Sequence, residues 1–300
     1  MNERIKQTKI YIGKHFRLFK NEKGWKVIIF AAVVSFLVSS VTKGIMFGDD
    51  VNTKMGFFTL ISACIWIGIF NSIQNICKER DIVKREHRTG LHITSYVASH
   101  LIYQGAICLV EALMIVIISG IMIGYPSENA LFISTYAEYF ITYFLVTYAA
   151  DVLALAISSI VKSTTTAMTI MPFILIFQLL FAGVLFSLSG SMETVANFTI
   201  SKWGLQASGI SCDYNNLEKL EQKEMRYQLK KIAKSKNYKM TEEELDEVIK
   251  EAYEDTDTYN ATYEYSLSNL MGNWSALLIH TAIYAIISVA ALELVDRDKR

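Results

Sequence analysis

The chain has 300 residues, 52% of them hydrophobic, and its 29 basic and 29 acidic side chains leave no formal net charge at pH 7. With only 2 prolines, this composition excludes an intrinsically disordered or proline-rich linker protein. The apolar residues are gathered into runs of about twenty with few charges, which is the length that a helix needs to cross a bilayer. The sequence therefore predicts an all-α membrane protein with several transmembrane helices.

Residues 1–26 form a basic segment, with eight Lys and Arg side chains against Glu3 and Glu22. Ile5, Ile12 and Phe16 recur at helical spacing. This pattern predicts an interfacial helix whose lysines face anionic lipid on the cytoplasmic side. A disordered basic tail is the alternative.

Two apolar runs follow, and they predict span one from about Val27 to Phe47 and span two from Met55 to Cys77. Span two carries Asn71 near its inner end. Because an amide facing lipid would lack hydrogen-bond partners, we expect Asn71 to face other helices.

A charged segment, from Lys78 to His100, separates span two from span three, and it is too polar to lie in hydrocarbon. Its first half predicts a short helix over residues 79–90, ending at Gly90, where glycine relieves the turn that follows. On charge alone, an ordinary basic cytoplasmic loop is the alternative.

The remaining spans are predicted from Leu101 to Gly124, on both sides of Asp151, from Thr165 to Leu188 and from Trp274 to Leu294. Six crossings place both ends of the chain on one side. The short segments on that side are basic, whereas the opposite turns are not, so the positive-inside rule predicts that both termini are cytoplasmic. We expect a multi-pass protein of the plasma membrane, with residues 27–189 as spans one to five and residues 273–300 as span six and its tail.

Residues 190–272 form a long polar loop that this topology places outside the cell. Thr241 and Glu244 form a capping box ahead of an amphipathic helix, and a second helix is predicted from about Asn216 to Lys234. The two helices are expected to pack as an antiparallel pair. A mobile acidic insert is the alternative.

Several kinds of chemistry have no motif in this sequence. There is no G-x-x-x-x-G-K-[ST] phosphate-binding loop, so we expect no ATP hydrolysis by this chain. We also expect no catalytic residues, and the four cysteines and five histidines predict no metal site. Nothing suggests a nucleic-acid partner.

The order of residues in the charged segment is similar to that of a known family of membrane proteins. Glu79-Arg80, Arg85-Glu86, Gly90-Leu91 and Ser95-Tyr96 resemble the first intracellular loop of type-2 (ABCG-like) ATP-binding-cassette permeases. The run from Leu153 to Phe186 also resembles the fourth-to-fifth-span region of these permeases.

The resemblance implies the permease subunit of an exporter for an amphiphilic substrate. It implies a dimer with a second copy or a paralogue, and a separate ATPase subunit that holds the ATP and Mg. Residues 79–90 would be the coupling helix that docks on this ATPase, through Glu79, Arg80, Asp81, Lys84, Arg85, Glu86, Arg88 and Gly90.

The resemblance also implies a translocation path lined by spans two and five. Its candidate residues are Phe70, Asn71, Gln178 and Phe181, and their alternative role is helix packing. Glu111 and Asp151 are costly charges inside the membrane, which predicts structural pairing or protonation, or a proton-linked step.

Two other functions remain open from the sequence. The first is a proton-coupled secondary transporter that uses Glu111 and Asp151. The second is a membrane sensor or assembly factor whose external loop binds a ligand.

Overall fold

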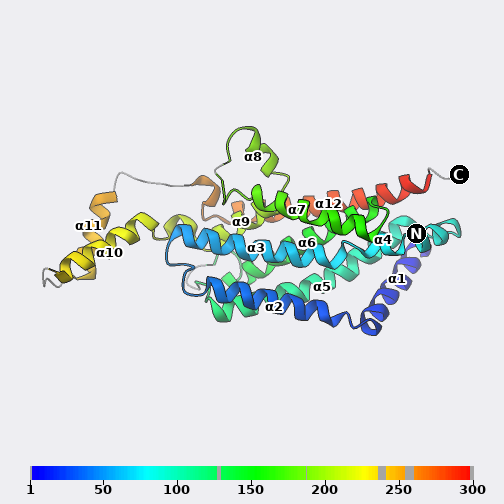
Figure 1. The fold of residues 1–300 in the computed structure, drawn as a ribbon, viewed down its shortest axis with the longest axis horizontal. Helices are drawn as coiled ribbons and strands as arrows, with labels where there is room; N and C mark the ends of the chain where they lie inside the picture. The colour runs from blue at the N-terminus through cyan, green and yellow to red at the C-terminus, as the bar shows by residue number, and fades with distance from the viewer. Residues whose placement is uncertain (1, 127–129, 187, 236–240, 254–259, 298–300) are drawn as a thin grey trace.

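The computed structural model describes residues 2–126, 130–186, 188–235, 241–253 and 260–297, and every regular element in these ranges is a helix. The helices form an elongated bundle (Figure 1). The amphipathic helix α1 (Asn2–Asn21), the charged helix α4 (Asn75–Arg88) and both chain ends lie at one end of this bundle. The helical pair α10 (Leu220–Ser235) and α11 (Glu242–Tyr253) lies beyond the other end.

Within the described ranges, five helical stretches are long and apolar enough to cross a membrane. They are α2 (Trp25–Thr42), α3 (Asp50–Ser72) with α4, α5 (Ile93–Met122), α6 (Thr135–Ile160) and α12 (Leu267–Arg297). In α3 and α6, 67% of the most apolar window is buried, against 22% in α2 and α12. Helices α3 and α6 therefore form the centre of the bundle, and α2 and α12 present apolar surface to the surrounding lipid.

The contact between α3 and α6 depends on a glycine. A Cβ at Gly68 would lie 2.2 Å from the carbonyl oxygen of Thr147 on α6 and 2.9 Å from the Cβ of Ala150. Glycine therefore lets the two backbones approach closely, as small residues do in other membrane bundles.

The helices of predicted spans one and five end earlier than expected. Helix α2 ends at Thr42 instead of Phe47, because Gly44 and Phe47 both take positive φ angles. Helix α7 (Thr164–Leu180) ends eight residues before Leu188, and Gly183 takes a positive φ in the turn that follows. With 17 residues, α7 is about 26 Å long, slightly less than the roughly 30 Å of the hydrocarbon core. The sixth crossing is thus still a prediction.

The segment after α7 contains a buried helix that was not predicted from the sequence. The chain passes through the short helix α8 (Ser191–Ala196) and then forms α9 (Ile200–Ser211), which packs against α3, α6 and α12. Gln178 on α7 accepts hydrogen bonds through Oε1 from the backbone N–H groups of Ile200 (2.9 Å) and Ser201 (3.2 Å). It thereby satisfies two free donors at the first turn of α9.

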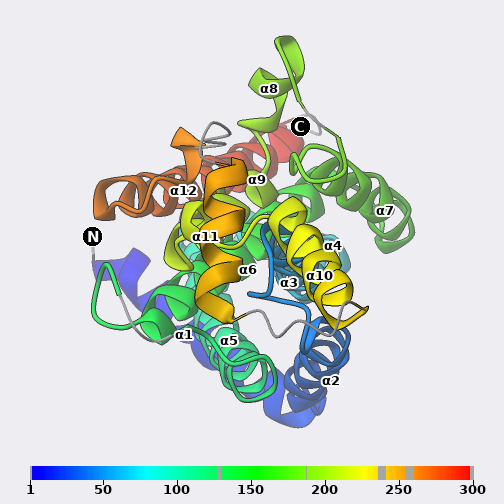
Figure 2. The same ribbon diagram turned by 90° about the vertical axis from the view of Figure 1, so that its left-hand side faces the viewer.

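The helical pair predicted in the long loop is present (Figure 2). Thr241 and Glu244 form the expected capping box, with Thr241 Oγ1 accepting from the N–H of Glu244 and Glu244 Oε2 accepting from the N–H of Thr241. Arg226 on α10 forms ion pairs with Glu242 and Asp246 on α11. This charged contact joins the two helices.

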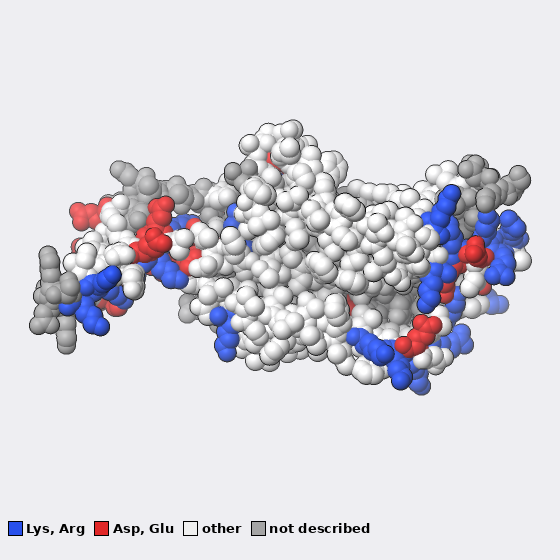
Figure 3. All heavy atoms as spheres, viewed as in Figure 1, with Lys and Arg blue, Asp and Glu red and all other residues white. Residues whose placement is uncertain are grey.

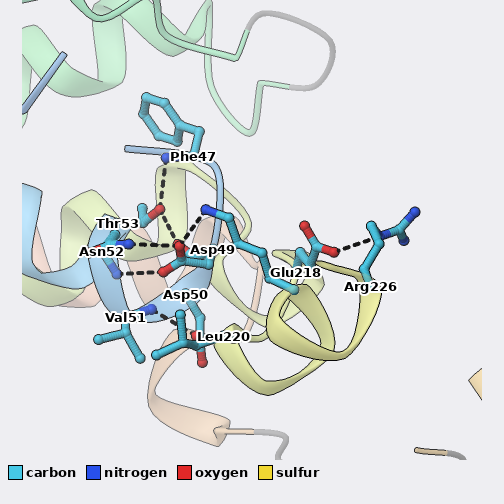
Figure 4. Close-up of polar contacts among 10 residues, drawn as sticks. Phe47, Asp49, Asp50, Val51, Asn52, Thr53, Glu218, Leu220 and Arg226 are labelled. Atoms are coloured by element: carbon cyan, nitrogen blue, oxygen red, sulfur yellow. Dashed lines mark hydrogen bonds and ion pairs between the residues drawn. The ribbon is translucent and has the colours of Figure 1, made fainter. Parts of the chain in front are cut away.

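The pair is fixed to the membrane bundle at the turn before α3 (Figure 4). The fully buried side chain of Asp49 accepts hydrogen bonds from the N–H and the side-chain amide of Asn52 and forms an ion pair with Lys223 at 2.9 Å. Asp50 N–H donates to Glu218 O, and Leu220 N–H donates to Asp50 Oδ1. Burial raises the pKa of Asp49, but Lys223 and Asn52 outweigh this effect and hold the pKa below its usual value.

Candidate functional site

Helix α4 lies at the end of the bundle that holds both termini, and charged side chains are concentrated at this end (Figure 3). It runs from Asn75 to Arg88, and Gly90 takes a φ of 108° just after it. The predicted short helix and its glycine stop are therefore present. The coupling role of this helix stays a prediction.

The first turn of α4 is bound to the end of α6. Ser158 Oγ accepts hydrogen bonds from the N–H groups of Ile76 and Cys77, each at 3.1 Å. Arg80 donates to the carbonyl oxygens of Ser159 (3.1 Å) and Val161. A cation at the carboxyl end of a helix satisfies its free carbonyl groups and the helix dipole. Arg80 thus serves an internal contact.

A second face of α4 is covered by α1. Lys14 forms an ion pair with Glu79 at 3.1 Å, and Tyr11 donates a hydrogen bond to Glu86. Burial and the Glu86 carboxylate raise the pKa of Tyr11, so the phenol keeps its proton. The Gln7 side chain donates a hydrogen bond through Nε2 to Gly90 O and accepts one through Oε1 from the N–H of His92. Glu79, Glu86 and Gly90 are therefore engaged within the chain.

Asp81, Arg85 and Arg88 remain on the exposed face of α4, and Lys84 is half-buried. Arg85 donates a hydrogen bond to Asp81 O of its own helix at 3.3 Å. Of the eight predicted residues, Glu79, Arg80, Glu86 and Gly90 are thus bonded within the chain, and Asp81, Arg85 and Arg88 present exposed charges.

A polar cluster lies inside the bundle at the inner end of α3. Asn71 Nδ2 donates to Glu111 Oε2 at 2.7 Å, and Ser72 Oγ donates to Asp151 Oδ1 at 2.6 Å. Gln104 on α5 donates to Ser72 Oγ at 2.6 Å and to Asn71 O at 3.2 Å. The two carboxyl groups are fully buried, and neither forms an ion pair with a cation among the described residues.

The four candidate path residues each have partners of their own in this chain. Phe70 is 41% exposed and contacts the rings of Phe30 and Trp66. Gln178 is buried and engaged with α9, and Phe181 is half-buried beside Phe177. Their role in a translocation path stays a prediction.

The residues that hold α4 in place were not predicted from the sequence. Gln7, Tyr11 and Ser158 lie far along the chain from their partners, so no local pattern predicted these contacts. Within the described parts of the chain, no group of three His, Cys, Asp or Glu residues is arranged to bind a metal, and the four cysteines are free.

Comparison with known proteins adds two findings. Residues 6–207 match the sequence model of a family described as ABC-2 type transporter. The chain is also 23% identical over 223 residues to the ABC transporter ATP-binding/permease protein Rv1747 of Mycobacterium tuberculosis (strain ATCC 25618 / H37Rv). This match covers 70% of the chain and 26% of the relative, so the chain spans only about a quarter of that protein's length.

Proposed function

The chain belongs to the ABC-2 type transporter family, and from this membership we propose that it is a membrane-spanning permease subunit driven by a separate ATPase subunit through α4. The observation that supports this most is the division of α4 into two faces. One face is bonded to α1 and α6, and the other presents Asp81, Arg85 and Arg88. A helix that receives motion from a partner needs both kinds of face.

The route of motion follows from these contacts. Helix α4 continues from α3 with a break of only two residues, and it is hydrogen-bonded to the end of α6. A displacement of α4 therefore moves α3 and α6, which pack backbone to backbone at Gly68. Rigid helices that move together can switch a membrane path between two open states.

We further propose that the transporter is a dimer in the plasma membrane and exports an amphiphilic substrate. Phe70 and its aromatic neighbours form an exposed apolar surface on the bundle, which suits contact with lipid or with a second copy. Helices α7 and α9 together complete the predicted sixth crossing, which puts α1 and α4 in the cytoplasm and α10 and α11 outside.

The test is to isolate the tagged chain from its native membrane with its ATPase. We expect an ATP-binding-cassette ATPase to co-purify, and its recovery to fall by at least tenfold in the double variant Arg85→Glu, Arg88→Glu. Glu86 is unsuitable for charge reversal because Tyr11 binds it within the chain.

The matched control is Lys231→Glu, Lys234→Glu, which makes the same charge change on exposed positions of α10. This control should retain the ATPase. An unchanged ATPase yield in the α4 variant would refute the docking role.

A proton-coupled carrier is the second candidate, because Glu111 Oε1 and Asp151 Oδ2 are buried without a hydrogen-bond partner in the described structure. Transport in reconstituted vesicles distinguishes the two proposals. Transport that requires ATP and does not change with an imposed pH gradient favours the permease. Transport that requires the pH gradient and not ATP favours the carrier.

A further inference from the structure

A cavity of about 400 Å³ lies between α1, α2, α3, α4 and α5, close to the charged end of the bundle. The surface is hollowed between α2 and α3 at this end (Figure 3). Apolar side chains from four of these helices line it, namely Leu18, Val27, Ile82 and Ile107. The volume is sufficient for a small ligand.

One wall of the cavity holds a buried histidine without partners. His100 is 3% exposed, and neither of its ring nitrogens has a hydrogen-bond partner among the described residues. Its ring lies 4.1 Å from that of His15, whose pKa is lowered by burial to about 4, so His15 is neutral at pH 7. A buried polar group without a hydrogen bond lowers the stability of the fold. A polar ligand that bonds a ring nitrogen of His100 would remove this cost.

Other residues that line the cavity offer hydrogen-bond acceptors. Asn71 lines it and donates through Nδ2 to Glu111, but its own Oδ1 is buried without a partner among the described residues. Glu22 and Glu79 also line the cavity, against Lys78 as the one cation among the lining residues that the structure describes. A ligand that donates hydrogen bonds satisfies Asn71 Oδ1, whereas an anionic ligand would meet the carboxylates of Glu22 and Glu79, of which Glu79 is paired with Lys14.

We propose that this cavity binds one amphiphile with an amine head group, which enters from the inner leaflet. The amine donates to Asn71 and His100, and the alkyl chain lies against Leu18, Val27 and Ile107. Such a site is separate from the docking of an ATPase on the outward face of α4, and it holds whether or not that docking occurs.

The proposal is tested by native mass spectrometry of the full chain in a mild nonionic detergent, with dodecylamine as the probe. Dodecyl sulfate and dodecanol provide the same alkyl chain with an anionic and a neutral head. We expect one dodecylamine per chain, with at least tenfold weaker binding of the sulfate and of the alcohol. Equal binding of the three probes would overturn the amine assignment.

Two variants locate the site. His100→Leu removes both unpartnered nitrogens, and Ile107→Trp fills the cavity. Each should weaken dodecylamine binding by at least tenfold. His100→Leu should also unfold at a higher temperature than the parent chain, because it removes an unsatisfied polar group. The control is His280→Leu on α12, where Nδ1 lies 2.7 Å from Ala276 O on its own helix and the ring lines no part of this cavity.

Unchanged dodecylamine binding in both variants would place the ligand elsewhere and end the proposal. Binding lost in Ile107→Trp but kept in His100→Leu would reject the histidine contact. A final arm with lysophosphatidylethanolamine distinguishes the sources of the amine. Tighter binding than dodecylamine assigns the site to an aminophospholipid, and weaker binding assigns it to a free cationic amphiphile.

Discussion

Among the buried carboxyl groups, Asp49, Glu111 and Asp151 are each stabilised by a different kind of partner. Asp49 is bound by an ammonium and two amide donors, Glu111 by the amide of Asn71, and Asp151 by the hydroxyl of Ser72. A cation favours the charged form of a carboxyl group, whereas a neutral donor compensates only part of the cost of burial. Asp49 therefore serves as a charged anchor, and the other two belong to the internal polar cluster.

The anchor gives a prediction for Asp49→Asn. The replacement removes the ion pair with Lys223, so we expect roughly 1–3 kcal/mol lower stability at pH 7 and faster proteolysis between α9 and α10. Because the folded pKa of Asp49 is depressed, its stabilising effect is present above the ordinary value of 3.8 and is lost as the pH falls through the lower folded value.

The measurement is the difference in Tm between the parent chain and Asp49→Asn as a function of pH. This difference should be constant from neutral pH down to about pH 4 and should shrink below that. A difference that grows on acidification has the opposite sign and would rule out Asp49 as a charged anchor.

At the scale of helices, the close contact of α3 and α6 predicts a large effect of a small change. Gly68→Ala places a methyl group against the backbone oxygen of Thr147, which cannot move without shifting α6. We expect a loss of roughly 1–3 kcal/mol, as for other overpacked cores. Gly272→Ala on α12 is the control, since nothing lies within 4 Å of its added Cβ. Thermal unfolding of the two variants measures the contrast, and equal stability would contradict the described packing.

Helix α4 predicts a separation between two arginines. Arg80→Ala removes the donors that bind Ser159 O and Val161 O, so it should lower stability by about 1.5–3 kcal/mol. Arg85→Ala should leave stability nearly unchanged and reduce the stimulation of the partner ATPase. Unfolding and ATPase assays on both variants test this assignment, and it fails if Arg85→Ala is the less stable of the two.

The long helices were predictable from the sequence because their apolar runs are longer than any soluble helix needs. The charged helix, its glycine stop and the capping box of α11 were predictable from local patterns as well. Helix α9 was missed because it has only 12 residues, and small polar residues such as Ser201 and Ser208 weaken its apolar signal. Its burial depends on Gln178, which binds its first turn from another helix.

The division of α4 into an internal face and an exposed face also could not be predicted from the sequence. Glu79 and Glu86 look equivalent to Asp81 in the sequence, and only the position of α1 distinguishes them. The contacts that place α1 join residues 65 to 87 positions apart. Such separations leave no periodic pattern.

For the whole molecule, a permease driven through α4 needs α4 and the α10–α11 pair on opposite sides of the membrane. The two occupy opposite ends of the bundle (Figure 1). Among the described residues, five helical stretches are long and apolar enough to span, and the proposed topology assigns the remaining crossing to α7 with α9. An ATPase in the cytoplasm can push on α4 only in this arrangement.

The most direct test is the labelling of single introduced cysteines in intact cells with a membrane-impermeant maleimide. The four native cysteines are buried, so the background is low. Lys231→Cys on α10 should react in intact cells, and Arg88→Cys on α4 should react only after the cells are permeabilised. Reaction of Arg88→Cys from outside, or of both positions from the same side, would contradict the account.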